Sequence, residues 1–207
     1  MYISHFYREE DRNKIADFVR EHDFATLVLA ENNLPMASHL LVDFQTDSDG
    51  TWLFNGHMAR ANPLWRKFDP EREVLLMFGG PNTYISPTWY NHLNVPTWNY
   101  IAVHLYGLPR VIDGGDELRN ILARLIRRYE TNSAYRMETL PSDFAEQQMQ
   151  GTIGFQVRAT RLEASFKLSQ NRDDEDHANI IQHLKARGDE QSLAIAEQMT
   201  KNRKSQT

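Results

Sequence analysis

The alternation of apolar and polar residues divides this chain into helix-like and strand-like segments. Apolar residues recur at helical spacing over residues 9–22, which predicts an amphipathic helix. Short apolar runs bounded by turn residues then predict six strands. We expect these strands at 24–30, 36–44, 52–56, 74–78, 98–108 and 153–162. The fourth is expected to end at the Gly-Gly-Pro sequence of residues 79–81.

A helical insert is predicted between the last two strands, at about residues 116–150. Apolar residues at 118, 121, 122, 125, 126 and 129 follow helical spacing, and a shorter helix is expected over 142–150. A further helix follows the acidic run at 173–176 and ends at Gly188. We therefore predict one domain at 1–187, followed by a polar tail at 188–207 that frays.

The order of the predicted elements indicates the fold class. The strands follow one another as hairpins and the helices come late, without regular alternation of strand and helix. This order favours an antiparallel sheet or barrel with helices packed outside, in a mainly β fold with helices (α+β). It disfavours a Rossmann sheet.

Composition and charge narrow the classes of function. The chain has no cysteine, which excludes disulfides, thiolate metal sites and a catalytic thiol, and we expect a cytoplasmic protein. Its 28 acidic and 23 basic residues give a net charge of −5, which disfavours DNA binding through the whole surface. No apolar run approaches the roughly 18 residues of a membrane span, and residues 1–12 do not resemble a signal peptide.

Several common catalytic motifs are absent from the sequence. It contains no G-x-S-x-G elbow, no phosphate-binding G-x-x-x-x-G-K-[ST] loop, no G-x-G-x-x-G and no H-E-x-x-H. Its eight histidines are scattered, so we predict no metal site. Hydrolase and nucleoside-triphosphate functions therefore lose most of their support.

A first candidate site lies at residues 56–65, GHMARANPLW. Asn62 and Pro63 are typical of a helix start, and a strand that leads into a helix N-terminus favours anions. Arg60 offers a planar fork that matches phosphate oxygens, and His57 offers another donor. The alternative is that Arg60 pairs with a surface carboxylate and that His57 packs against Trp65.

A second candidate site combines residues 84–90 with residues 95–100, where aromatic residues alternate with hydroxyl and amide residues. Trp98 and Tyr100 belong to this set and offer faces on which a flat ring can stack. The alternative, which the residues alone favour, is an aromatic strand pair that fills a barrel core.

A third candidate site follows the last predicted strand and is rich in polar side chains. Its polar residues are Lys167, Ser169, Gln170, Asn171 and Arg172. They are suited to bind the polar edge of a heterocycle or a phosphate. The alternative is a solvated loop that caps the next helix, and residue chemistry alone does not separate the two.

Together these segments resemble the FMN-binding negative transcriptional regulators of the PaiB type. The resemblance runs in order from about residue 1 to residue 187 and rests on three long motifs among seven segments. The segments are HF at 5–6, FATLV at 24–28, SHL at 38–40, GHMARANPLW at 56–65, YISPTWY at 84–90, VPTWNY at 95–100 and KLSQNR at 167–172.

This resemblance implies an FMN-binding split β-barrel, similar to the pyridoxamine-phosphate-oxidase-like flavoproteins, that forms a homodimer with flavin near the subunit interface. By the same resemblance His57, Arg60 and Asn62 are expected near the flavin phosphate. Trp98, Tyr100 and residues 167–172 are expected near the ring and the dimer-facing side. If Arg60 does not hold the phosphate, we expect residues 167–172 to do so.

Three functions remain open at this point. The leading hypothesis is a flavin-binding regulatory protein that represses transcription, directly or indirectly. The alternative is an FMN-dependent oxidoreductase with a nicotinamide reductant, in which Lys167 or Arg172 lies near flavin N1. A third hypothesis, direct DNA contact, is less favoured than a solvated basic face. Its candidate residues are Arg119, Arg124, Arg127 and Arg128.

Overall fold

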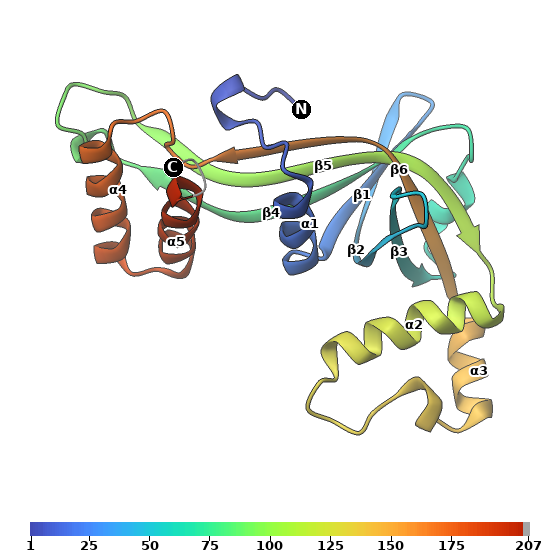
Figure 1. The fold of residues 1–207 in the computed structure, drawn as a ribbon. Coiled ribbons are helices and arrows are strands. Elements are labelled where there is room, and N and C mark those ends of the chain that lie inside the picture. The colour runs from blue at the N-terminus through green and yellow to red at the C-terminus, as the bar shows by residue number, and fades with distance from the viewer. Residues whose placement is uncertain (205–207) are drawn as a thin grey trace. The chain divides into compact units, whose positions relative to one another are not determined.

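The computed structural model describes residues 1–204 and contains six strands and five α-helices (Figure 1). The strands are β1 (Phe24–Glu31), β2 (Leu34–Thr46), β3 (Trp52–Ala59), β4 (Val74–Ile85), β5 (Thr97–Ile112) and β6 (Thr152–Lys167). The helices are α1 (Arg12–Glu21), α2 (Gly115–Tyr129), α3 (Ser142–Gln150), α4 (Asp174–Arg187) and α5 (Glu190–Lys204). None of the described helices is long and apolar enough to cross a membrane.

The six strands form a closed barrel in the order β1-β2-β3-β6-β5-β4. The pairs β1–β2, β1–β4, β2–β3 and β3–β6 are all antiparallel. This confirms the predicted α+β fold, an antiparallel barrel with helices outside it.

Residue contacts divide the chain into two compact units. The first, which we call the barrel unit, contains residues 16–78 and 104–162. The second, the terminal unit, contains residues 1–15, 79–103 and those from 163 onward. Long strands contribute to both: β4, β5 and β6 each begin in one unit and end in the other.

Inward side chains at every second strand position form the core of the barrel unit. Leu27, Phe54 and Phe155 are completely buried, and the rings of Phe54 and Phe78 lie 5.5 Å apart. Each such side chain contributes about 1.5–3 kcal/mol through burial. The core also demands a glycine, because a Cβ on Gly107 would lie 2.5 Å from the carbonyl oxygen of Arg158. Two neighbouring strands therefore approach more closely than any side chain would permit.

The predicted insert packs as a helical layer within the barrel unit. The apolar side of α2 buries Leu118, Ile121 and Leu125 in one cluster with Met137 and Met149. Leu41 of β2 packs against the same cluster, which joins the insert to the barrel.

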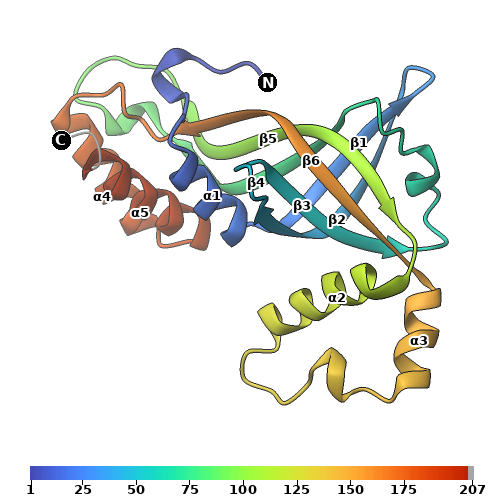
Figure 2. The same ribbon diagram turned by 45° about the vertical axis from the view of Figure 1, so that its right-hand side comes forward.

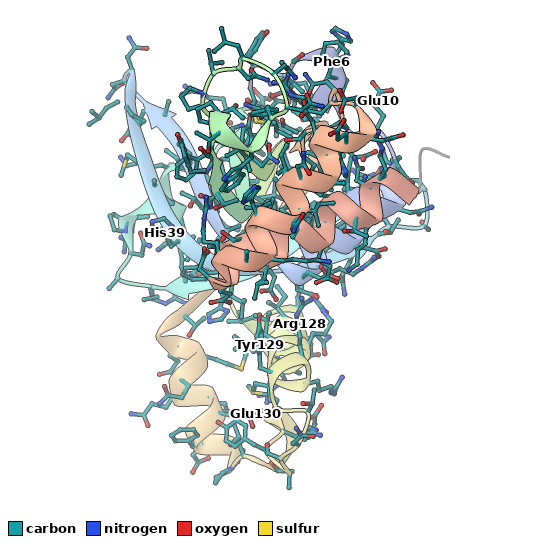
Figure 3. All side chains as sticks on the ribbon, turned by 90° about the vertical axis from the view of Figure 1, so that its left-hand side faces the viewer. Phe6, Glu10, His39, Arg128, Tyr129 and Glu130 are labelled. Atoms are coloured by element: carbon teal, nitrogen blue, oxygen red, sulfur yellow. The ribbon has the colours of Figure 1, made fainter. Side chains whose placement is uncertain are left out.

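Ion pairs fasten α2 along its length. Arg124 Nε lies 2.7 Å from Asp43 Oδ2, and Arg128 Nε lies 2.7 Å from Asp23 Oδ2. The hydroxyl of Tyr129, next to Arg128 at the end of α2 (Figure 3), donates to the same carboxylate of Asp23.

Helices α4 and α5 lie side by side in the terminal unit (Figure 2). Asp173 caps α4 by accepting a hydrogen bond from the backbone N–H of Asp176, and α4 ends at Gly188 with a φ of +74°. Most of the predicted polar tail forms α5, which buries Ile195, Ala196 and Met199. These apolar residues fall on one helix face, which explains why the segment packs rather than frays as expected. Residues 205–207 of that prediction lie outside the described residues.

The prediction that β4 ends at the Gly-Gly-Pro sequence is wrong. The strand continues to Ile85, and Pro81, Thr83 and Ile85 are buried along the extension. Neither Gly79 nor Gly80 has a positive φ, so both fit an extended strand. Local turn propensity is outweighed here by burial of the residues that follow.

Candidate functional site

The first predicted segment begins a helix as expected, but that helix is short. Pro63–Lys67 is a 3₁₀ helix of five residues with Asn62 as its N-cap. Asn62 Oδ1 accepts the backbone N–H of Leu64 at 3.0 Å, and its Nδ2 donates to Ser38 Oγ at 2.8 Å. Both ends of the Asn62 side chain are therefore used within the fold. The backbone N–H of Leu64, which an anion at this helix start would need, already donates to Asn62.

Arg60 is committed to contacts with the helical insert. Its NH1 and NH2 groups donate to the two carboxylate oxygens of Asp113 at 3.2 Å and 2.5 Å. Its Nε donates to the carbonyl of Gln150 at 2.6 Å, at the C-terminus of α3, where the helix dipole favours a cation. The hydrogen bond to Asp113 raises the pKa of Arg60. This geometry matches the alternative in which Arg60 pairs with a surface carboxylate.

His57 lies opposite Gly154 of β6, in the middle of the sheet. Burial lowers its pKa, so the neutral ring is favoured. Its Nδ1 is buried and finds no hydrogen-bond partner within residues 1–204. His57 is therefore not suited to balance the negative charge of a phosphate, although its neutral ring can donate or accept a hydrogen bond.

The two aromatic residues of the second segment lie on one side of β5. Trp98 is 48% exposed, its Nε1 donates to Asn82 Oδ1 at 3.1 Å, and its ring meets Tyr84 edge to face. Tyr100 is half-buried, and the pKa of Tyr7 is raised by burial and, to a smaller extent, by the nearby Tyr100. The exposure of Trp98 does not fit the alternative in which it fills a barrel core.

Two residues of the third segment shape the turn that follows β6. Ser169 has a φ of +58°, and its Oγ exchanges hydrogen bonds with the side-chain amide of Asn99. Gln170 Oε1 accepts the N–H of Leu168 at 2.8 Å, and its Nε2 donates to the carbonyl of Phe166 at 2.6 Å. The side chains of Ser169 and Gln170 therefore fix this turn, whereas Asn171 is exposed.

The turn brings the two cations of the third segment among tyrosine rings. Lys167 Nζ donates to Thr97 Oγ1 at 2.7 Å and lies 5.6 Å from the ring centre of Tyr7. The guanidinium carbon of Arg172 lies 4.9 Å from the ring centre of Tyr90. Tyr100 lies close enough to Tyr7 to affect its pKa, and we group it with the two cations and the two tyrosines as the tyrosine–cation cluster. Its members are Tyr7, Tyr90, Tyr100, Lys167 and Arg172.

The cluster carries positive charge that the fold does not neutralise. Neither Lys167 nor Arg172 forms an ion pair with a carboxylate in the described part of the chain. Burial and the charge of Arg172 together lower the pKa of Lys167. Burial raises the pKa of Tyr7 and Tyr90, so both phenols keep their protons at neutral pH. Cations and protonated phenols together form the donor set that an anion requires.

The predicted site residues are thus divided between the two units. His57, Arg60 and Asn62 belong to the barrel unit. Trp98, Tyr100 and residues 167–172 belong to the terminal unit.

Sequence reasoning missed Tyr7, and it placed Tyr90 in the second candidate segment without predicting that Tyr90 lies beside Arg172. Tyr7 directly follows the HF motif at 5–6, and Tyr90 ends the YISPTWY motif at 84–90. Their neighbours within these motifs were the only available signal.

Comparison with known proteins identifies relatives of the whole chain. Residues 1–161 match a family described as “Putative FMN-binding domain”. The chain is 36% identical to the protein named protease synthase and sporulation protein PAI 2 of Bacillus subtilis, over 100% of both chains.

Two solved structures show the same fold at low sequence identity. The FAD and heme binding protein of Mycobacterium smegmatis superposes with a TM-score of 0.63 and 16% identity, over 83% of this chain and 79% of the other. The flavocytochrome of Azotobacter vinelandii superposes with a TM-score of 0.55 and 16% identity, over 84% of this chain and 76% of the other. These similarities confirm the predicted split-barrel architecture.

Proposed function

The chain belongs to the FMN-binding domain family, and from that premise we propose that it is a flavin-binding negative regulator of transcription that acts indirectly. FMN is the cofactor of this family. The name of the Bacillus subtilis relative links that protein to protease synthesis and sporulation, and we extend a regulatory role to this chain. We further propose that it is cytoplasmic and works as a homodimer with flavin near the subunit interface.

The tyrosine–cation cluster is the site at which we place the flavin phosphate. The observation that carries this proposal is that Lys167 and Arg172 lack carboxylate partners among the described residues while phenols surround them. FMN carries a phosphate monoester with a charge near −2 at neutral pH, and such a group pairs with cations and hydroxyl donors. The donor set therefore fits FMN. Arg60, by contrast, is engaged with Asp113.

Aromatic residues near the cluster suit the flat ring of the flavin. Tyr100 and the half-exposed Trp98 lie on one side of β5, two residues apart. Aromatic faces stack on a flat tricycle, and the hydroxyl of Tyr100 offers a donor or acceptor for its edge. The exposed Asn171 adds an amide in the same turn as Arg172. Contacts of His57, Arg60 and Asn62 with the flavin stay predictions of the sequence.

Indirect regulation is supported by the pairing of three of the four α2 arginines that were candidates for DNA contact. Arg124 pairs with Asp43, Arg127 with Glu138 and Arg128 with Asp23. A guanidinium that is already paired with a carboxylate gains little from a DNA phosphate, and the net charge of −5 repels DNA. We therefore propose that flavin occupancy, rather than direct DNA contact, carries the signal.

Titration of the full chain with FMN and with riboflavin tests the cofactor site. We expect the visible flavin spectrum to shift on binding and FMN to bind more tightly than riboflavin, which lacks the phosphate. Lys167→Met is expected to weaken FMN binding by roughly 10-fold or more, because a charge-assisted contact contributes about 1.5–3 kcal/mol. Lys185→Met, a substitution of an exposed lysine on α4, is the matched control. Equal affinity of wild type for FMN and riboflavin would refute phosphate recognition.

Promoter binding at several salt concentrations tests the regulatory mechanism. We expect no protein–DNA complex at physiological salt, with or without FMN. A specific complex whose affinity falls steeply as salt rises would show direct DNA binding and refute indirect action.

A further inference from the structure

One loop leaves the tyrosine–cation cluster and returns to it. The loop begins after Tyr90 and ends at Thr97. The guanidinium of Arg172 packs on the ring of Tyr90, and Thr97 accepts a hydrogen bond from Lys167. The first turn of α4 holds the start of this loop. The backbone N–H of Asn91 donates to Asp176 Oδ1 at 2.9 Å, and Asn91 Nδ2 donates to Glu175 Oε2 at 2.9 Å.

Asp176 is a buried carboxylate with one oxygen left over. The residue is 0% exposed, and its Oδ2 makes no hydrogen bond with any described residue. His92 Nδ1 lies 3.2 Å from that oxygen, and the side chain of His92 is 50% exposed. A buried carboxylate with an unsatisfied oxygen gains more from a positive neighbour than a solvated one does.

The contacts of His92 define its neutral tautomer. Its Nδ1 lies 2.9 Å from Asn91 Oδ1, which can only accept, so Nδ1 carries the proton. Its Nε2 lies 3.3 Å from Asn94 Nδ2, and Asn94 Oδ1 accepts the N–H of Val95 at 2.9 Å, which fixes the orientation of that amide. Nε2 is therefore the acceptor, and a second proton would bind there.

His92 is connected to the cluster through a single tyrosine. The rings of Tyr90 and His92 lie 5.9 Å apart, and Arg172 stacks on Tyr90. Burial raises the pKa of Tyr90, the adjacent Arg172 lowers it, and the charge of Asp176 raises it further. A change of charge at His92 therefore changes the electrostatic potential at Arg172, because only the ring of Tyr90 lies between them.

We propose that His92 makes the anion affinity of the tyrosine–cation cluster depend on pH. This inference rests on the proposed function, because it concerns the site that we assign to the phosphate. When His92 is neutral, the negative charge of Asp176 opposes an incoming anion. When His92 is protonated, its positive charge offsets Asp176, and the anion binds more tightly.

Other charged groups around His92 do not supply the same effect. Asp173 caps α4, Asp174 pairs with Arg203, and burial lowers the pKa of His177. Glu175 is engaged with Asn91. Lys167 and Arg172 are the cations of the cluster itself, and histidine is the side chain whose ordinary pKa lies between pH 5 and pH 8.

Coulomb's law sets the size of the effect. A unit charge roughly 10 Å from a dianion changes the affinity of that dianion by roughly 15-fold at a protein surface with an effective dielectric constant of about 40. Salt weakens the effect over the same distance. We expect the affinity to rise by this factor between pH 7.5 and pH 5.5.

Sulfate competition against FMN is the test, because sulfate stays a dianion at both pH values whereas the FMN phosphate titrates near pH 6. For the full-length wild type we expect sulfate to bind roughly 15-fold more tightly at pH 5.5 than at pH 7.5, and less than this as salt is raised. His92→Gln should remove this difference, and Asp176→Asn, which keeps an acceptor for Asn91, should tighten sulfate binding at pH 7.5. His39→Gln, a substitution in the barrel unit, should keep the wild-type response.

The outcomes separate this inference from the proposed function. Sulfate affinity that is independent of pH in wild type, or equally dependent on pH in His92→Gln, would overturn the role of His92 alone. FMN binding that is insensitive to Lys167→Met would instead refute the phosphate site. Circular dichroism at both pH values verifies that each variant is folded.

Discussion

At the scale of single residues, two arginines of the same type have opposite surroundings. Arg60 meets a carboxylate and two backbone carbonyls, whereas Arg172 meets an aromatic face and no carboxylate among the described residues. A guanidinium with a full set of partners holds structure together, and one without them is available for an anion. The surroundings, rather than the residue type, therefore indicate the role of each.

The contacts of Arg60 predict a structural role. Arg60→Ala should lower the thermal midpoint of unfolding, because it removes the link from β3 to Asp113 and to the end of α3. Asp113→Ala should lower it as well, and the double variant should add little to the larger single effect. Thermal denaturation of the four proteins measures this coupling. Fully additive changes would show that the two side chains act independently.

The close approach at Gly107 predicts a steric effect. Gly107→Ala should destabilise the protein by about 1–3 kcal/mol, because the new Cβ would meet backbone that has little room to move. Gly79→Ala is the control, since a Cβ there meets nothing within 4 Å. Urea unfolding compares the two variants. Equal stabilities would contradict the packing described for this barrel.

At the scale of elements, three carboxylates fasten the helical insert to its unit. Asp23, Asp43 and Asp113 meet Arg128, Arg124 and Arg60 in turn. The insert is thus held at both ends and in the middle of α2. This arrangement leaves the basic side of α2 largely neutralised.

The hydrogen bond between Tyr129, at the C-terminal end of α2, and Asp23 predicts that stability falls at alkaline pH. Burial and the hydrogen bond to Asp23 raise the pKa of Tyr129 to about 12, above its ordinary value of 10.0. The folded state therefore keeps a proton that the unfolded chain releases, so stability is full below pH 10 and falls as pH rises toward 12. Tyr129→Phe should reduce the slope of unfolding free energy between pH 10 and pH 11.5. An unchanged slope would show that Tyr129 is not responsible.

Hydrophobic periodicity predicted most of the elements but not all of their ends. The repeat over residues 118–129 marks α2, because its apolar face is buried locally in one cluster. The extension of β4 beyond Gly79 was not predictable, since it depends on burial of Thr83 and Ile85 by distant segments. The candidate phosphate site likewise contains residues that the sequence predicts and residues that only the fold brings in. Lys167 and Arg172 stand out in the sequence, whereas Tyr7 joins them only through the fold.

At the scale of the whole molecule, the family match and the two units cover different parts of the chain. The family match covers residues 1–161, whereas Lys167 and Arg172 lie beyond it, in the terminal unit. The relative from Bacillus subtilis nevertheless aligns over the full length. The two cations of the candidate phosphate site therefore lie in a part of the chain that the full-length relative shares and the family match does not reach, whereas its three tyrosines lie within the match.

The ratio of FMN affinity to riboflavin affinity in two arginine variants shows which arginine holds the flavin phosphate. This ratio isolates the phosphate, because the two ligands share the ring. We predict that Arg172→Gln lowers it by roughly 10-fold or more, as expected for one lost charge-assisted contact. Arg60→Ala should leave the ratio at its wild-type value. The opposite pattern, with the ratio reduced in Arg60→Ala and unchanged in Arg172→Gln, would contradict the proposed phosphate site and place the phosphate in the barrel unit.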